Sequence, residues 1–121
     1  MTKYDDGQVL TADEIFTLAC DILIPSALGD VITAKNVDEV RAKIIVEGAN
    51  LPVSADAEEI LHKRGVLAVP DFVANAGGVI SSYAEFRGYN PKQMFEEVSR
   101  KVVKNTKLVL EKSQKEKITP R

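Results

Sequence analysis

The sequence predicts a three-layer α/β fold built on a parallel sheet, and two observations support this. First, three short apolar runs recur at nearly constant spacing, at residues 22–24, 43–46 and 66–69. Each run is continuous rather than alternating, which is typical of a strand buried on both faces. Second, helix-capping residues lie between the runs, and strands that alternate with helices favour a parallel sheet. Right-handed crossovers are then expected to place helices on both faces.

Capping boxes mark the first helices. The box that begins at Thr11 opens a helix over roughly residues 12–19, and a second box that begins at Asn36 predicts a short helix near residues 37–42. In such a box, a side chain at the N-cap and a Glu or Gln three residues later satisfy each other's backbone N–H groups. We therefore expect a helix before the first strand and another before the second.

The later helices are longer. Ser54 is a suitable N-cap for a helix that continues to about Arg64, where Gly65 provides a C-terminal stop. Residues 75–86 show apolar positions at helical spacing after the third strand.

A long final helix is expected to begin where Asn90 can cap and Pro91 suits the first turn. Its apolar stripe predicts a helix over residues 91–116 with one covered face. The chain end is polar from about Lys112, so residues 117–121 are expected to form a frayed tail.

Composition excludes several classes of function. The 121 residues form one domain at most, and a net charge of −2 gives no sign of a nucleic-acid or membrane partner. The apolar runs are far too short to span a bilayer, and residues 1–7 lack the apolar segment of a signal peptide. Cys20 is the only cysteine, and His62 has no second ligand nearby. We therefore expect a cytoplasmic protein without an internal disulfide or a metal site.

Candidate binding residues follow two of the strands. The second strand ends in Glu47-Gly48-Ala49-Asn50, where small residues let a flat ligand approach and the amide can donate and accept hydrogen bonds. Judged alone, a plain turn is the favoured interpretation. In a parallel sheet, however, ligands lie beyond the carboxyl ends of the strands.

The third strand leads into Asn75-Ala76-Gly77-Gly78, whose free N–H groups precede a helix. Judged alone, a flexible loop with an Asn N-cap is the slightly favoured interpretation of this segment. Ser82 lies four residues after Gly78, hence on the same helical face, although a serine there is also an ordinary surface residue. Glu47 and Asp71 sit at strand ends, and the sequence leaves open whether they face each other. No Gly-x-Gly-x-x-Gly turn occurs.

Three segments, in order and correctly separated, resemble the C-terminal part of the glutamate/leucine/phenylalanine/valine dehydrogenase family. They are Cys20 to Ala27, Ala42 to Asn50 and Val69 to Phe86. The resemblance implies a partial Rossmann-like fold, the second half of a doubly wound parallel sheet followed by a long C-terminal helix. Residues 1–121 would then be one partial NAD(P)-binding domain, with the sheet and crossover helices over about residues 10–90.

The resemblance also assigns cofactor contacts. Asn50 and Asn75 would contact NAD or NADP near the nicotinamide ribose, while Pro25, Ser26 and Ala27 would line its neighbourhood. The sequence does not distinguish NAD from NADP.

Substrate contacts follow in the same way. Gly78 and Val79 would border the reacting amino acid, and Ser82 would hydrogen-bond a side-chain carboxylate. Relatives that act on apolar amino acids tend to carry an apolar residue at this position, so Ser82 favours glutamate.

The activity implied is oxidative deamination of L-glutamate to 2-oxoglutarate and ammonia, with hydride transfer to NAD(P). The family's catalytic lysine and aspartate belong to an N-terminal domain that nothing here resembles, so we expect no catalytic residue in this chain and negligible turnover by the chain alone. The alternatives are a stand-alone nucleotide-binding module, an inactive remnant, or a dehydrogenase of an apolar amino acid.

Self-association is also expected. Residues 22–24 would form an unpaired, apolar edge strand, and such edges recruit another chain unless they are covered. We expect a homo-oligomer formed edge to edge or by exchange of the last helix. The alternative is that the helix after Thr11 folds over this edge.

Overall fold

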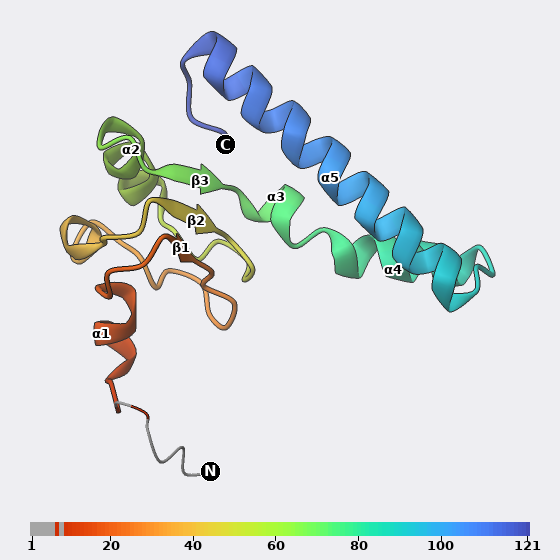
Figure 1. Cartoon of the computed structure of the whole chain (residues 1–121), viewed down its shortest axis with the longest axis horizontal. Coiled ribbons are helices and arrows are strands. Elements are labelled where there is room, and N and C mark those ends of the chain that lie inside the picture. The colour runs from red at the N-terminus through yellow and green to blue at the C-terminus, as the bar shows by residue number, and fades with distance from the viewer. Residues whose placement is uncertain (1–6, 8) are drawn as a thin grey trace.

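The computed structural model describes residue 7 and residues 9–121. In chain order its elements are α1 (Ala12–Phe16), β1 (Ile22–Leu23), the 3₁₀ helix η1 (Val37–Glu39), β2 (Ile44–Val46), α2 (Ala55–Lys63), β3 (Leu67–Val69), α3 (Asp71–Ala74), α4 (Gly77–Phe86) and α5 (Pro91–Glu116) (Figure 1). The N-terminal segment, for which we expected no signal peptide, lies almost entirely outside the described residues.

The described strands form a parallel sheet in the order β1-β2-β3. Ile22 pairs with Ile44, which in turn pairs with Leu67. The predicted α/β class, the parallel pairing and the long C-terminal helix are therefore confirmed. All three strands point the same way, so their carboxyl ends meet at one edge of the sheet (Figure 1).

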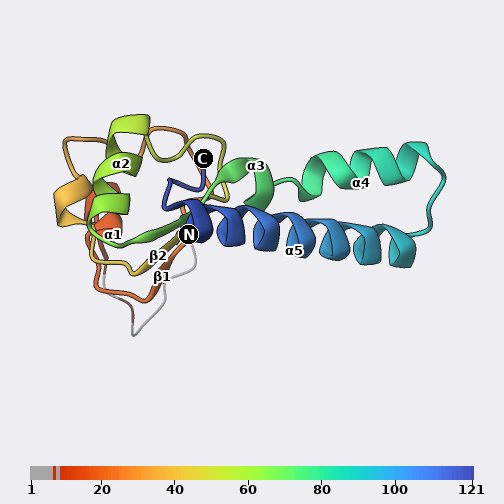
Figure 2. The same cartoon turned by 90° about the horizontal axis from the view of Figure 1, so that it is seen from above.

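The hydrophobic core lies on one face of this sheet. Ile45 is fully buried there, with Leu23 beside it, and this face is covered by η1, α2 and Phe16 of α1. Figure 2 shows α2 on one side of the strands. On the opposite face Ile22 is 54% exposed, so the expected helical cover on both faces is not met over β1. The reason is topological: right-handed crossovers that step through β1, β2 and β3 in one direction all emerge on the same face.

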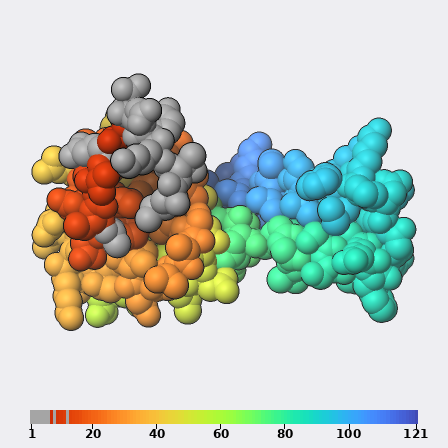
Figure 3. Space-filling model, turned by 90° about the horizontal axis from the view of Figure 1, so that it is seen from below, coloured from red at the N-terminus to blue at the C-terminus, as the bar shows by residue number. Residues whose placement is uncertain are grey.

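Helices α4 and α5 form an arm that projects from the sheet (Figures 2 and 3). Ala84 is fully buried between them, and a Cβ atom at Gly77 would lie 3.4 Å from Val98 Cγ1. The turn between the helices contains Gly88 at φ 72°, a left-handed conformation that favours glycine. Among the helices of the described residues, none is long and apolar enough to cross a bilayer.

Local capping explains most helix starts. The capping box at Thr11 is present, although α1 ends at Phe16 rather than near residue 19. Ser54 caps α2, and Asn90 forms a capping box at the start of α5. Each satisfies a backbone N–H that the helix itself leaves unpaired.

The predicted capping box at Asn36 is wrong. Its side chain makes no cap hydrogen bond, and the helix that follows is a single 3₁₀ turn. Instead Asn36 Oδ1 accepts from the Thr33 N–H at 2.8 Å and Nδ2 donates to the Val31 carbonyl at 2.9 Å. Asn competes for nearby backbone groups in this way because its side chain is short.

The chain end differs from the frayed tail that was expected. Lys117 adopts a left-handed conformation at φ 56°, which ends α5 and turns the chain back. The Ile118 N–H then donates to the Ser113 carbonyl at 3.2 Å, and Ser113 Oγ donates to the Ile118 carbonyl. Arg121 consequently reaches the carboxyl end of the sheet, where it meets acidic side chains. The polar composition of the chain end suggested that it is solvated, because composition alone does not show which distant acidic side chains Arg121 will meet.

Candidate functional site

The segments that follow the three strands meet at the carboxyl end of the sheet, and we call residues 25–27, 48–51 and 70–75 the strand-end rim. The Ala49 N–H donates to the Pro25 carbonyl at 2.8 Å, which joins the first two segments. Gly48 lies so close to Ser26 that a Cβ atom at Gly48 would overlap the serine side chain. A glycine is therefore favoured here by close approach, as the small-residue pattern suggested.

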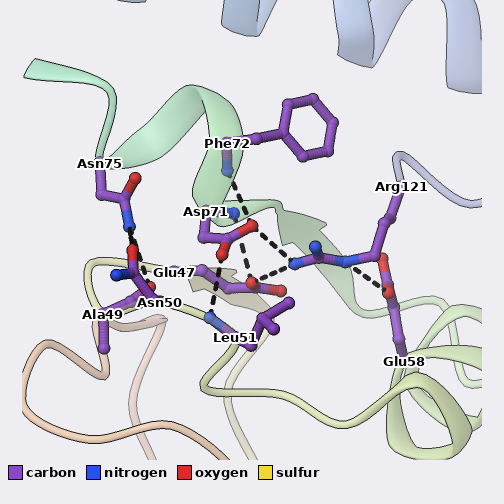
Figure 4. A network of polar contacts seen from close by, with 9 residues as sticks. All are labelled: Glu47, Ala49, Asn50, Leu51, Glu58, Asp71, Phe72, Asn75 and Arg121. Atoms are coloured by element: carbon purple, nitrogen blue, oxygen red, sulfur yellow. Dashed lines mark hydrogen bonds and ion pairs between the residues drawn. The ribbon is translucent and has the colours of Figure 1, made fainter. Parts of the chain in front are cut away.

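Two asparagines join the second and third segments of the rim. Asn75 Nδ2 donates to Asn50 Oδ1 at 2.7 Å and to the Ala49 carbonyl at 3.2 Å (Figure 4). Asn50 is exposed, so its own amide NH₂ group faces solvent and can bind a ligand. The structure thus brings together the two asparagines that were predicted from strand ends 25 residues apart.

Leu51 has a strained backbone that Asp71 supports. Its φ of 46° is left-handed, a region that leucine rarely adopts. The Leu51 N–H donates to Asp71 Oδ2 at 2.9 Å, and Asp71 Oδ1 accepts from the Phe72 N–H at 2.8 Å. Burial acts to raise the pKa of the Asp71 carboxyl, but the Leu51 N–H and Arg121 outweigh it and hold this pKa below its ordinary value.

Glu47 lies beneath the rim and is fully buried. Its Oε2 accepts from the Asp71 N–H at 3.2 Å and from Arg121. Burial raises the pKa of the Glu47 carboxyl to about 7, and Arg121 opposes this rise only in part. The two strand-end acids therefore do meet, through the backbone of Asp71 and a shared arginine.

The substrate contacts implied by resemblance lie on α4. The carbonyl of Gly78 accepts from Ser82 Oγ at 3.1 Å, and Val79 is 78% exposed. A Cβ atom at Gly78 would meet nothing within 4 Å. This surface is open because α4 turns its other side toward α5.

The predicted residues therefore fall into two groups. Pro25, Ser26, Asn50 and Asn75 are joined by direct contact or close approach within the rim, and Ala27 lines an apolar hollow beside α1 together with Pro25 and Ser26. Gly78, Val79 and Ser82 of α4 follow the rim in sequence. None of the contacts given above joins them to the two asparagines.

Sequence reasoning missed Arg121 and Glu58. Arg121 Nε donates to Glu58 Oε2 at 3.0 Å, although 63 residues separate them. One available signal was Glu47 itself, an acid at the end of a continuous apolar strand, which requires a partner when buried.

The chain matches a known family along its whole length. The family profile described as Glutamate/Leucine/Phenylalanine/Valine dehydrogenase matches residues 1–121. NADP-specific glutamate dehydrogenase of Saccharolobus shibatae is 50% identical over 86 residues, covering 71% of this chain and 20% of that protein. Glutamate dehydrogenase of Aeropyrum pernix is 42% identical over 116 residues, covering 91% of this chain and 28% of that protein.

Solved structures agree with this assignment. The crystal structure of L-tryptophan dehydrogenase from Nostoc punctiforme superposes with a TM-score of 0.80 at 32% identity, covering 90% of this chain and 33% of that one. The chain thus spans between a fifth and a third of the length of the proteins it matches. It belongs to the glutamate/leucine/phenylalanine/valine dehydrogenase family.

Proposed function

We propose that this chain provides the nicotinamide-facing part of an amino-acid dehydrogenase that oxidises L-glutamate to 2-oxoglutarate and ammonia and passes hydride to NAD or NADP. The observation that carries the proposal is the contact between Asn75 Nδ2 and Asn50 Oδ1 at the carboxyl end of a parallel sheet. Coenzymes of open α/β folds bind at that end of the strands.

The chemistry of the strand-end rim suits a ribose and an amide. Asn75 Nδ2 donates to Asn50 Oδ1 and to the Ala49 carbonyl, and these bonds hold the NH₂ group of Asn50 at a defined position. Gly48 lets Ser26 pack closely against the strand end beside it. These groups bind and orient a ligand, and rigid orientation is the main contribution that such residues make to hydride transfer.

Glutamate is the proposed substrate because Ser82 lies on the exposed side of α4, where its hydroxyl can turn from Gly78 to a carboxylate. A hydrogen bond to a charged group is worth roughly 1.5–3 kcal/mol, which is enough to select between substrates. The two glutamate dehydrogenases described above support the same assignment.

A second candidate is a dehydrogenase of an apolar or aromatic amino acid. It is favoured by the likeness to L-tryptophan dehydrogenase and by Val79, which is 78% exposed next to Gly78. Glutamate remains preferred because an apolar side chain would offer the Ser82 hydroxyl no charged partner in place of the Gly78 carbonyl.

A chimeric enzyme tests the proposal. The segment of Aeropyrum pernix glutamate dehydrogenase that matches this chain would be replaced by it. We expect the chimera to reduce NAD(P) with glutamate, and Ser82→Val to lower its kcat/KM for glutamate roughly 10- to 150-fold while norvaline is little affected. Equal losses for both substrates would make Ser82 merely structural, and a folded but inactive chimera would contradict the proposal.

The chain alone is expected to show negligible turnover with glutamate. The acid of the described rim, Asp71, is engaged by the Leu51 N–H and by Arg121, and the amides, hydroxyl and backbone groups that remain hold a ligand but do not transfer protons at neutral pH. Sustained nicotinamide reduction by the chain itself that is lost in Asn75→Ala would overturn this part of the proposal.

We also infer self-association through β1. In the described part of the chain this strand pairs with β2 alone. Ile22 on the strand is 54% exposed, and Ile24 just after it is 58% exposed. An edge of this kind recruits a further strand. Sedimentation at micromolar concentration is expected to show a dimer or larger species, and a clean monomer with protected amides at residues 22–24 would contradict it.

A further inference from the structure

One arginine joins three buried acids beneath the strand-end rim. Arg121 Nη2 lies against Glu47 Oε2 and 3.0 Å from Asp71 Oδ1, while Nε donates to Glu58 Oε2 at 3.0 Å (Figure 4). The acids come from the end of β2, from α2 and from the start of α3. None of them is more than 8% exposed. Carboxylates buried so completely need a cation, and every ion pair that these acids make among the described residues is with Arg121.

The same acids hold the backbone of the rim. Asp71 accepts from the N–H of Leu51, the residue that follows Asn50, and its carbonyl accepts from the Asn75 N–H at 2.9 Å. Asp71 is itself fixed by Glu47, which accepts from its N–H. A continuous set of hydrogen bonds therefore leads from Arg121 to both asparagines.

Leu51 makes this support necessary. A left-handed leucine persists only where its surroundings hold it in place, and the partner of its N–H is Asp71. If Asp71 moved, the Leu51 backbone would keep the Asp30 N–H, which donates to its carbonyl at 2.9 Å, but its own N–H would lose its partner and the residue could relax toward an ordinary conformation. Asn50 would then leave the position in which it meets Asn75.

Charge balance gives the reason that Asp71 would move without the arginine. Glu47, Glu58 and Asp71 face one another, with His62 of α2 as a further titratable group that acts on Glu58. Glu47 Oε1 and Glu58 Oε1 are buried and already have no hydrogen-bond partner among the residues that the structure describes. Removing Arg121 would leave three acids that repel one another. Either a carboxylate must take up a proton and become neutral, or an acidic side chain must move away.

We propose that Arg121 is a positioning residue for the coenzyme site, which holds Asp71 and through it the Leu51 backbone so that Asn50 and Asn75 stay in contact. The positioning of the asparagines stands on the contacts described above, and the assignment to a coenzyme rests on the proposed function. The opposing view is that Arg121 only anchors the end of the chain.

The test compares Arg121→Met with Arg64→Met in the full chain. Arg64 is a matched control because it also binds across the fold, donating to the Val37 carbonyl and, at 2.6 Å, to the Val40 carbonyl, away from the rim. Three quantities are measured: the urea midpoint, hydrogen exchange of the Asn75 side-chain NH₂ by NMR, and the dissociation constant of nicotinamide mononucleotide. The last probe is chosen because it carries the nicotinamide ribose without the adenosine half.

Both variants are expected to lower the urea midpoint. Only Arg121→Met should speed exchange of the Asn75 NH₂, by roughly tenfold or more, and weaken mononucleotide binding by a similar factor. Arg121→Lys should fall between it and the wild type, because one ammonium group cannot match the fork that meets three acids. If Arg121→Met fails to fold, Arg121→Lys carries the comparison.

Unchanged Asn75 exchange in the Arg121 variants would overturn the positioning role. So would equal changes in Arg64→Met, since these would reflect lost stability alone. If the wild-type chain does not bind the mononucleotide at millimolar concentration, the proposed coenzyme site fails, whereas the Asn75 signal still decides whether Arg121 orders the rim.

Discussion

Glu47→Gln should flatten the pH dependence of the free energy of unfolding between about pH 4.5 and 7. In the folded chain, burial raises the pKa of Glu47 from 4.5 to about 7. The folded state therefore holds a proton that the unfolded state has already released. Stability from this group is present below pH 4.5 and is lost as the pH rises through 7. A glutamine cannot ionise, so the variant lacks this loss.

The magnitude follows from the size of the pKa change. A rise from 4.5 to about 7 corresponds to about 2–3 kcal/mol of unfolding free energy lost between pH 5 and pH 8. The attraction of Arg121 is already contained in this pKa, because it opposes the rise that burial causes. At pH 5 the folded chain holds Glu47 neutral, so glutamine should change the free energy of unfolding little there, whereas at pH 8 the variant should be the more stable protein by about 2–3 kcal/mol.

Urea unfolding at pH 5 and pH 8 measures the difference in the free energy of unfolding between the variant and the wild type. Glu59→Gln is the matched control. Glu59 lies on α2 at the surface, 3.6 Å from Lys63, with its side chain 70% exposed. Glu58, whose pKa burial also raises, keeps a pH dependence of its own in all three proteins, so Glu47→Gln should flatten the slope without abolishing it. If Glu47→Gln keeps the full pH dependence of the wild type, Glu47 is not the buried acid that the structure indicates.

Further substitutions test the rim. Asn75→Asp would place a carboxylate oxygen against Asn50 Oδ1, where Nδ2 now donates at 2.7 Å. It should cost about 1–3 kcal/mol at pH 7 in urea unfolding, and an unchanged midpoint would contradict the contact. Gly48→Ala should cost about 1–3 kcal/mol through overlap with Ser26. Adding Ser26→Gly should recover much of this loss, and no recovery would show that the strain lies elsewhere. Leu51→Gly should raise the free energy of unfolding by about 1 kcal/mol, because glycine adopts the left-handed conformation without strain. An unchanged or lower free energy of unfolding would show that Leu51 is not strained.

Sequence reasoning succeeded where the determinants are local. The caps at Thr11, Ser54 and Asn90 each depend on residues within one helical turn, and all three were found. The strands were found because the apolar runs are rich in β-branched residues and too short for a buried helix, and these two features decide between the two structures. Their parallel pairing then placed Asn50 and Asn75 at one end of the sheet without further information.

The failures have physical causes as well. Asn36 was expected to cap a helix because its spacing to Glu39 fits, but its side chain bonds backbone groups that precede it. The single turn of α3 after Pro70 was missed because four residues carry no periodicity. Arg121 was assigned to a frayed tail because its partner Glu47 lies 74 residues away. Contacts at such separation depend on the completed fold.

The central claim is that the strand-end rim contacts the nicotinamide end of a coenzyme. Its most direct test is a ¹H–¹⁵N NMR titration of the chain with nicotinamide mononucleotide. The account predicts saturable shifts at the amides of residues 26–27 and 48–51 and at the Asn75 side chain, with little change along α5. Shifts confined to other surfaces, or none at millimolar ligand, would contradict it.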